Sequence, residues 1–331
     1  MSDITASGRL ARQACAAFPR AGSLTLGRML HADHPLVFAS YDTARRAVRY
    51  ARGECASGGG CKTPHPVARI PLAVIPESFS KKRSDFMIDG PARILVMCDA
   101  HIPYHDKGAV EAAVKTGKRR AVTGVYLGGD WADFYRVSQF ERDPEARRLP
   151  DEINAVRDSL AYLRDQFPKA RIWYRKGNHE RRYDSYLRIS APELLGLDCM
   201  GLDGVLGLSD MGITYIDEYT PIKFGKHLYG LHGNEYGGGA GSPVNPARGL
   251  LLKTKQCSFC GHWHRTSEQP DRTLAQTQLA AWSVGCLCDL HPEYASQNQW
   301  NHGHAILTID RAGGFCFLNL RSEGGKVYGD A

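Results

Sequence analysis

The sequence contains no long hydrophobic run, and none of its apolar stretches approaches the ~18 residues that a membrane-spanning helix needs. The first 20 residues also lack the continuous apolar segment of a secretory signal peptide. These two absences favour a cytoplasmic protein without a membrane partner. Hydrophobic residues make up 43% of the 331 residues and charged residues 23%, which is typical of a globular chain with room for one large domain and an appendage.

Cysteine is too sparse for a disulfide scaffold, because ten cysteines spread over 331 residues do not make the dense framework of a small secreted domain. Four of them form a Cys-x2-Cys pair and a Cys-x-Cys pair late in the chain, namely Cys257, Cys260, Cys286 and Cys288. Such a set could hold a structural zinc ion. The alternative is that they are core residues, because the first pair lies on an apolar strand and cysteine is commonly buried.

Residues 1–66 are predicted to form a small, mainly helical, Arg-rich region, followed by a linker at 67–90. Helices are expected at 24–32 and 41–52, and in the second one Ala44, Val48 and Ala51 share a face while four arginines make the other side basic. Two short helices of this kind resemble a module that contacts nucleic acid. The alternative is a helical prefix packed on the main domain with a solvated Arg face. The net charge of +7 fits an anionic partner but equally fits a role in solubility.

Five strand-like apolar runs between residues 94 and 260 each end in side chains that can bind metal. The motifs that follow them are Asp99-Ala100-His101, Gly129-Asp130-Trp131-Ala132-Asp133, Gly177-Asn178-His179-Glu180, Leu231-His232-Gly233 and Gly261-His262-Trp263-His264. In open α/β sheets, active sites gather where the carboxyl ends of strands meet. Further strands at 279–284, 305–309 and 315–320, with helices at 108–118 and 150–167, predict a layered α/β domain over 91–331.

The residue types in these motifs suit a pair of cations. Asp99 and His101 can face one ion if the chain turns between them, and Asp130 suits a bridging position because its two oxygens can serve two ions. The full set of candidate ligands is Asp99, His101, Asp130, Asn178, His232, His262 and His264. Because this set mixes oxygen and nitrogen donors without a thiolate, it suits Mn, Fe or Zn better than Mg or Ca.

The series Asp-x-His, Gly-Asp-x-x-Asp, Gly-Asn-His-Glu, His and Gly-His-x-His resembles the calcineurin-like metallophosphoesterase superfamily over about residues 91–328. Within that superfamily, the segments that begin at Gly177 and at His232 resemble phosphoesterases of phages and prophages. The resemblance implies a four-layer α/β/β/α sandwich with two mixed sheets. It also implies two divalent metal ions, of which Mn is preferred and Fe, Zn and Mg are alternatives.

The resemblance also assigns roles to individual residues. Asp99, His101 and His264 would hold one ion, Asn178, His232 and His262 the other, and Asp130 would bridge them. His179 matches a histidine that is not a ligand but lies beside the leaving group, which makes it the candidate general acid. Asp133 would orient a ligand or His179, or alternatively would only cap the turn. Phe134 stands where many members carry Arg, so the phosphate contact is expected instead from Arg136, Arg181 or Arg182.

The implied activity is hydrolysis of phosphodiester bonds, with DNA, RNA or nucleotides as the expected substrates and a hydroxide shared by the two ions as the nucleophile. One alternative is a phosphomonoesterase or protein phosphatase. Another is a metal-stabilised binding protein without catalysis, although the presence of His179, which is not needed as a ligand, argues against it. A homodimer is compatible with the resemblance, since many members of the superfamily dimerise.

Overall fold

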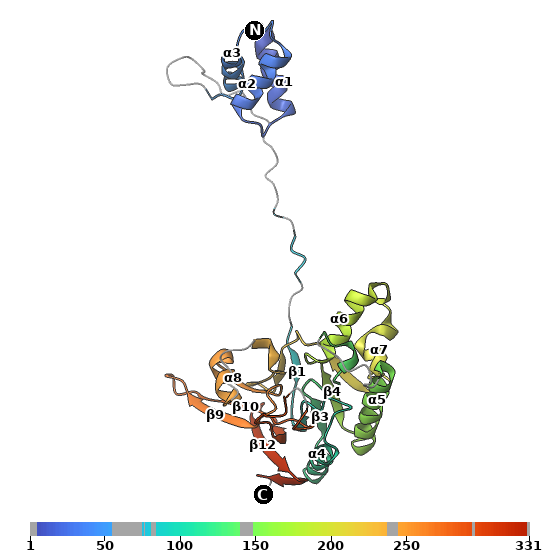
Figure 1. Cartoon of the computed structure of the whole chain (residues 1–331). Helices are drawn as coiled ribbons and strands as arrows, with labels where there is room; N and C mark the ends of the chain where they lie inside the picture. Colours follow the sequence, from blue (N-terminus) through green and yellow to red (C-terminus); the bar gives the residue numbers. More distant parts are fainter. Residues whose placement is uncertain are drawn as a thin grey trace. The chain divides into compact units, whose positions relative to one another are not determined.

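The computed structural model describes residues 5–54, 75, 77–80, 84–139, 148–236, 244–292 and 295–329. The chain divides into two compact units, Met1–Lys81 and Lys82–Ala331. Each unit is described by itself, and both are shown in Figure 1.

The first unit contains three helices, α1 (Ala6–Ala17), α2 (Ser23–Asp33) and α3 (Tyr41–Ala51), which share a core of their own. Its fully packed members are Ala11, Ala14, Leu26, Leu30, Phe38, Ala44 and Val48. A capping box starts α3, because the Ser40 hydroxyl accepts from the Thr43 N–H at 3.2 Å and the Thr43 hydroxyl accepts from the Ser40 N–H at 3.1 Å. The predicted helices at 24–32 and 41–52 are confirmed as α2 and α3. Helix α1 lies outside the predicted helices, and alanine fills most of its apolar positions, including the buried Ala11 and Ala14.

The second unit is built on two mixed sheets. The six-stranded sheet has the order β1 (Phe86–Ile88), β6 (Ile222–Phe224), β7 (Leu228–Gly230), β8 (Cys257–Cys260), β10 (Gln278–Ser283) and β9 (Ser267–Arg272). The seven-stranded sheet has the order β13 (Lys326–Tyr328), β12 (Phe315–Glu323), β11 (His302–Ile309), β2 (Ala92–Met97), β3 (Gly124–Leu127), β4 (Arg171–Arg175) and β5 (Ile213–Ile216). The α-helices are α4 (Lys107–Arg119), α5 (Leu149–Gln166), α6 (Glu180–Ser190), α7 (Leu202–Leu206) and α8 (Pro246–Thr254).

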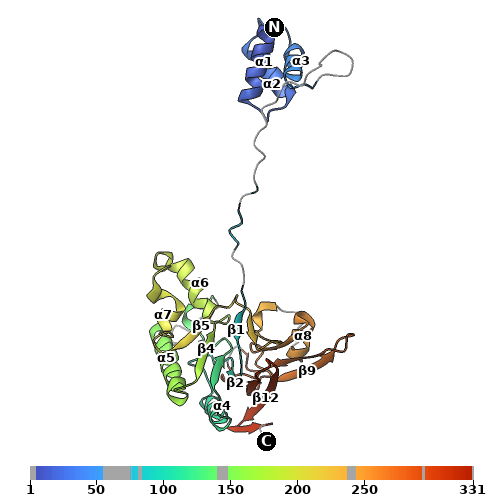
Figure 2. The same cartoon turned by 180° about the vertical axis from the view of Figure 1, so that it is seen from behind.

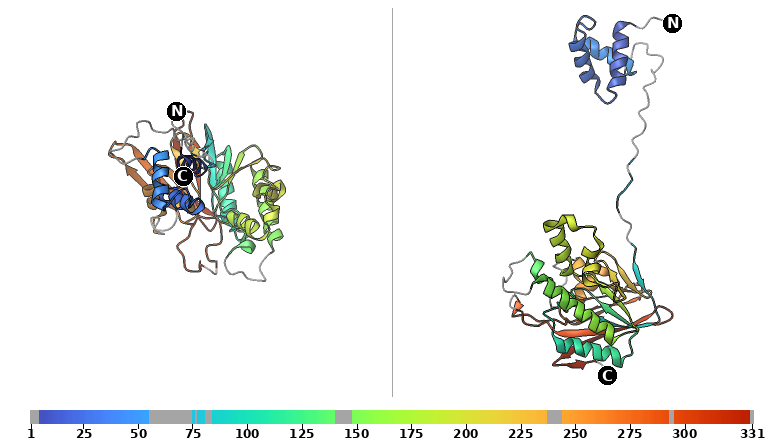
Figure 3. Two further views of the ribbon diagram at one scale, coloured as in Figure 1. Left: turned by 90° about the horizontal axis from the view of Figure 1, so that it is seen from above. Right: turned by 90° about the vertical axis from the view of Figure 1, so that its right-hand side faces the viewer.

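Alternating side chains of the seven-stranded sheet enter two different cores, which explains why its parallel strands read as continuous apolar runs. In β2, Leu95 and Met97 join the core beneath α4 and α5, whereas Ile94 and Val96 join the core between the sheets. On the far side of the six-stranded sheet, Leu250 and Leu251 of α8 form a further cluster. The layers are therefore helix, sheet, sheet and helix. Figures 2 and 3 show the ribbon from further sides. The predicted four-layer α/β/β/α class is confirmed.

The sequence-based boundaries differ from the structure at the start of the second unit. Strand β1 lies inside the 67–90 range predicted as a linker and pairs with β6 in parallel, from Phe86 opposite Ile222 to Ile88 opposite Phe224. A run of three residues is too short to show a strand periodicity, so only the pairing reveals it. Most of the remaining linker range lies outside the described residues.

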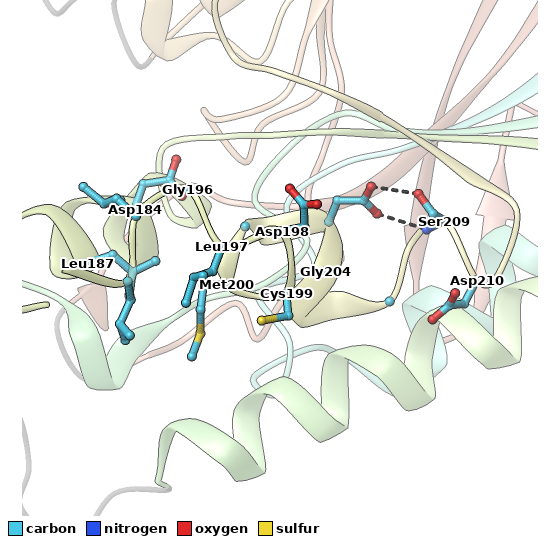
Figure 4. A pocket seen from close by; sticks show the side chains of 15 residues that line it. Asp184, Leu187, Gly196, Leu197, Asp198, Cys199, Met200, Gly204, Ser209 and Asp210 are labelled. Atoms are coloured by element: carbon cyan, nitrogen blue, oxygen red, sulfur yellow. Dashed lines mark hydrogen bonds between the residues drawn. The ribbon is translucent and has the colours of Figure 1, made fainter. Parts of the chain in front are cut away.

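Helix α6 and the segment between α6 and β5 line a hollow of roughly 630 Å³ (Figure 4). Apolar side chains such as Leu187, Leu197 and Met200 line it together with several carboxylates. Two of these carboxylates are already engaged, because Asp184 pairs with Lys176 and Asp203 accepts from the backbone and hydroxyl of Ser209. None of the candidate metal ligands lines this hollow. Among the described residues, no helix is both long and apolar enough to cross a bilayer.

Candidate metal centre

The candidate ligands lie close together, each just after the carboxyl end of a strand. These strands are β2, β3, β4, β7 and β8. His101 Nε2 lies 3.1 Å from His264 Nε2, which is 3.6 Å from Asp99 Oδ1. On the other side of Asp130, His232 Nε2 lies 3.1 Å from Asp130 Oδ2 and 3.0 Å from Asn178 Oδ1. The His262 ring is 5.1 Å from the His232 ring, and His101 Nε2 is 3.9 Å from Asp130 Oδ2. All seven predicted ligands thus converge in two groups that adjoin at Asp130.

The backbone at this site is unusual. Five of the seven candidate ligands, Asp99, His101, Asp130, His262 and His264, have φ between 50° and 65°. Non-glycine residues rarely adopt this left-handed region, and such residues cluster at functional sites. Two glycines also let the chain pass close to the carboxylates: a Cβ at Gly177 would lie 2.3 Å from Asp130 Oδ1, and one at Gly261 would lie 2.4 Å from Asp99 Oδ2. The loops are shaped to aim these side chains inward.

Glu180 holds two of the ligand loops together through its buried carboxylate. Oε1 accepts from the N–H groups of Trp131 and Ala132 at 2.8 and 3.0 Å and from the Tyr174 hydroxyl at 2.8 Å. Oε2 accepts from the N–H groups of Asp130 and Gly177 at 3.0 and 2.8 Å. The carboxylate therefore fixes the loop that carries Asp130 against the loop that carries Asn178.

Glu235 fixes the loop that carries His232, also by accepting hydrogen bonds from backbone N–H groups. Its Oε1 accepts from the His232 N–H at 2.9 Å, and its Oε2 accepts from the Gly233 N–H at 2.7 Å. The buried guanidinium of Arg175 donates to Oε1 at 2.6 Å and compensates the charge. Neither Glu180 nor Glu235 was assigned a role from the sequence, because both act through backbone N–H groups. The signal available is their position, three residues after Gly177 and three residues after His232.

Asp133 lies between a candidate ligand and the candidate general acid. Its Oδ1 is 2.9 Å from His101 Nδ1 and 2.8 Å from His179 Nδ1. Arg182 donates to the Asp133 carbonyl oxygen at 3.0 Å and has Nη2 3.0 Å from His179 Nε2. The geometry places His179, Asp133 and Arg182 together at the edge of the ligand cluster.

The other predicted phosphate-contacting arginines have different surroundings. Arg181 pairs with Glu218 at 3.3 Å and is 42% exposed. Arg136 lies in a single 3₁₀ turn (Tyr135–Val137), where its backbone N–H donates to Glu152 at 3.3 Å. The Phe134 ring is buried and stacks on Tyr183 with 5.4 Å between centroids. The side chain of Arg182 is joined to the cluster by its contacts with Asp133 and His179.

Electrostatics divide the histidines into two kinds. Burial alone would lower the pKa of His232. The adjacent Asp130 carboxylate has the larger effect and raises this pKa to about 10. Burial and the charge of His232 lower the pKa of His262 to about 4, so that this imidazole is neutral and can donate a lone pair. Burial also opposes the charged form of His179, but Asp130 and Asp133 raise its pKa, which favours the protonated form that an acid requires.

The donor set fits divalent cations. Asp99 Oδ1 is fully buried and accepts no hydrogen bond from any described residue. His101 Nε2 and His264 Nε2 face each other at 3.1 Å, where two neutral imidazoles can share at most one proton. A cation held between these atoms would satisfy all three, and Asp130, His232 and His262 form a second group of the same kind.

The four late cysteines separate into different surroundings. Cys257 packs in the core between the sheets, whereas Cys260 packs under α8. Cys286 and Cys288 are buried, and Cys288 Sγ lies 3.7 Å from His264 Nδ1. Among the described residues, no group of three or more possible ligands contains two of these thiols. The arrangement favours the core interpretation for the first pair.

Comparison of the whole chain with known proteins found solved structures of low sequence identity. The sequence matches no family model and no curated protein. Among solved structures, vacuolar protein sorting 29 from Cryptosporidium parvum is 14% identical, with 71% of this chain and 94% of that chain covered and a TM-score of 0.38. The single mutant of Vps29 from Entamoeba histolytica is 12% identical, with 71% and 95% covered and a TM-score of 0.36. YfcE, a phosphoesterase from E. coli, is 12% identical, with 68% and 97% covered and a TM-score of 0.30.

Proposed function

We propose that the chain is a metal-dependent phosphoesterase that hydrolyses phosphodiester bonds, with nucleic acids or nucleotides as its substrate class. The observation that carries this proposal is the convergence of seven oxygen and imidazole donors beside His179. That histidine is not needed as a ligand, yet it lies against Asp133 and Arg182 at the edge of the donor cluster. A purely structural metal site has no use for such a group.

Two divalent ions fit the site, with Mn²⁺ as the first choice for this mixed donor set. Asp99, His101 and His264 would hold one ion, Asn178, His232 and His262 the other, and Asp130 would face both. When bound, such ions lower the pKa of a coordinated water and neutralise phosphoryl oxygens.

The chain's own residues supply the proton and the positioning. Asp133 accepts the Nδ1–H of His179, which leaves His179 Nε2 as the atom that transfers a proton to the departing alkoxide. Arg182 Nη2 lies 3.0 Å from that nitrogen, and because a guanidinium can only donate, this contact must open before Nε2 carries the proton. The positive charge of Arg182 then favours release of the proton. The same guanidinium is placed to meet negative charge that develops on the phosphoryl oxygens.

The test compares two chromogenic substrates with added Mn²⁺. Bis-p-nitrophenyl phosphate is a diester monoanion, whereas p-nitrophenyl phosphate is a monoester dianion, and we expect the diester to have the larger kcat/KM. His179→Ala should keep its bound metal and lose roughly 10²–10⁴-fold in kcat, most for diesters with poor leaving groups. The matched control is His227→Ala, an exposed histidine on the turn between β6 and β7. If the metal-loaded chain hydrolyses neither ester, or if His179→Ala loses its metal, the proposal is wrong.

A further inference from the structure

The net charge of the chain lies almost entirely in the first unit. Met1–Lys81 has 11 Lys and Arg against 5 Asp and Glu, whereas Lys82–Ala331 has 31 against 30. The first unit therefore carries +6 of the net +7, and the unit with the metal centre is close to neutral. A charge bias this uneven indicates that the basic surface belongs to the small unit and is not a general solubility feature.

All eight basic residues of 1–54, leaving histidine aside, are arginines, and none is lysine. Four of them, Arg45, Arg46, Arg49 and Arg52, lie on or just after α3. Ala44 and Val48 of α3 are fully buried, so the arginines that directly follow them project beside the buried stripe and Arg46 projects farther round the helix. The planar guanidinium matches a phosphate with two parallel hydrogen bonds, which an ammonium cannot do.

At least half of these eight arginines form no salt bridge with a described residue. Arg52 donates to the Ala21 carbonyl and lies 4.0 Å from Glu54. Arg20, Arg28, Arg46 and Arg49, by contrast, form no salt bridge with any other described residue, and Arg20, Arg28 and Arg46 are exposed. Tyr41 and Tyr50 of α3 are 44% and 51% exposed, so aromatic rings accompany the arginines on this helix.

The helices that carry these side chains are held rigidly against each other. A Cβ at Gly27 of α2 would lie 2.8 Å from the Arg45 Cα, so glycine lets the backbones of α2 and α3 come into contact. The capping box at Ser40 and the separate core of the unit fix α3 further. The helices that carry the arginines are thus preformed.

We infer that the three-helix unit is a nucleic-acid-binding module that contacts the phosphate backbone through Arg28 of α2 and Arg46 and Arg49 of α3. The inference concerns a surface outside the metal centre and does not require the chain to be catalytic. If the chain does cleave nucleic acid, binding at this unit makes the encounter with the metal centre intramolecular and raises the effective substrate concentration.

The experiment uses the full chain in EDTA, so that no cleavage occurs, with fluorescence anisotropy of labelled 30-residue single-stranded DNA, duplex DNA and RNA. The test variant is Arg28→Ala/Arg46→Ala/Arg49→Ala. The matched control, Lys107→Ala/Lys115→Ala/Lys326→Ala, removes the same charge from exposed positions of the second unit. A third variant replaces the same three arginines by lysine and tests whether charge alone suffices. Circular dichroism checks that each variant keeps its helices.

We expect the test variant to weaken binding on the order of 10²-fold at 100 mM salt and to reduce the slope of log K against log salt by about 2 to 3. The control should stay within about threefold of the parent chain. The lysine variant should recover the salt slope but only part of the affinity, because an ammonium cannot form the paired hydrogen bonds of a guanidinium. The inference is overturned if no nucleic acid binds, if test and control weaken binding equally, or if anionic phosphatidylserine vesicles or an acidic peptide bind instead.

Hydrolysis of bis-p-nitrophenyl phosphate by the same proteins separates this inference from the proposed activity. We expect the test variant to keep the parent kcat/KM, because none of the three arginines belongs to the metal centre. Nucleic-acid binding without any hydrolysis would refute the phosphoesterase and leave the module standing. Hydrolysis without Arg-dependent binding would refute the nucleic-acid-binding module and leave the phosphoesterase standing.

Discussion

Replacing Glu180 by Gln tests how the ligand loops are held. The carboxylate accepts five hydrogen bonds, three at Oε1 and two at Oε2. A Gln side chain has only one acceptor oxygen, and its NH₂ group must face donors on one side. The less costly orientation places the Gln oxygen where Oε1 was, next to its three donors. The Gln NH₂ group then faces the N–H groups of Asp130 and Gly177, which lose their acceptor.

Each buried N–H that loses its acceptor costs about 1–3 kcal/mol, so two of them predict a loss of roughly 2–6 kcal/mol in the free energy of unfolding. For a unit of this size the melting temperature should fall on the order of 10 °C. Tyr174→Phe removes only one of the five bonds and should cost about 1 kcal/mol. Because the loops of Asp130 and Asn178 would loosen together, bound metal should fall as well.

The assay is urea unfolding in EDTA followed by tryptophan fluorescence. All five tryptophans, Trp131, Trp173, Trp263, Trp282 and Trp300, belong to the second unit, so the signal reports on that unit alone. Glu111→Gln on the exposed face of α4 is the control and should change stability by less than about 0.5 kcal/mol. A Glu180→Gln protein that unfolds like the parent chain and keeps its metal would refute the reasoning.

Three further predictions concern the same unit. Asp130→Asn should lose both metal and activity, which elemental analysis and diester hydrolysis would show together; retention of both metals would contradict a shared ligand. Gly261→Ala should also lose metal and activity, because its Cβ would lie 2.4 Å from Asp99 Oδ2. Gly201→Ala is the control and should keep both, because the nearest atom to its Cβ would be 3.5 Å away. Burial raises the pKa of Glu152 to about 7, so the folded state holds this proton more tightly than the unfolded state. That contribution is complete below about pH 4 and is lost as the pH rises through 7. The free energy of unfolding measured with urea should therefore be lower at pH 8 than at pH 5 by no more than ~3 kcal/mol. This difference should be absent in Glu152→Gln. If the variant shows the same difference, Glu152 is not its cause.

The sequence predicted the convergence of the site because each ligand follows a buried strand. In β2 and β3 every residue from Ile94 to Met97 and from Gly124 to Leu127 is buried, so the apolar runs were visible, and the polar residues after them had to lie at one edge. The helix predicted at 150–167 was equally clear, because Val156, Leu160 and Leu163 recur at helical spacing and are buried.

Other features depend on contacts that no pattern encodes. Strand β9 is a mostly exposed run of polar residues that exists because it pairs with β10, from Ser267 opposite Ser283 to Arg272 opposite Gln278. Arg181 and Arg182 are neighbours in the sequence, but on α6 they point about 100° apart, so one pairs with Glu218 and the other reaches His179. The different surroundings of these two arginines therefore needed the structure.

The carboxylate of Glu235 is bound to its own loop and to Arg175, and that of Glu180 to the backbone of two loops, so the chain's own groups tie these loops together. The ligand loops should consequently keep their shape when the site is empty, and ion uptake should then demand little ordering of the chain. In hydrogen–deuterium exchange, the amides of Asp130, Gly177 and His232 would remain protected in the presence of a chelator. Affinity for the ions would then come from a cage formed during folding, and stripping the metal would leave a chain ready to take it up again.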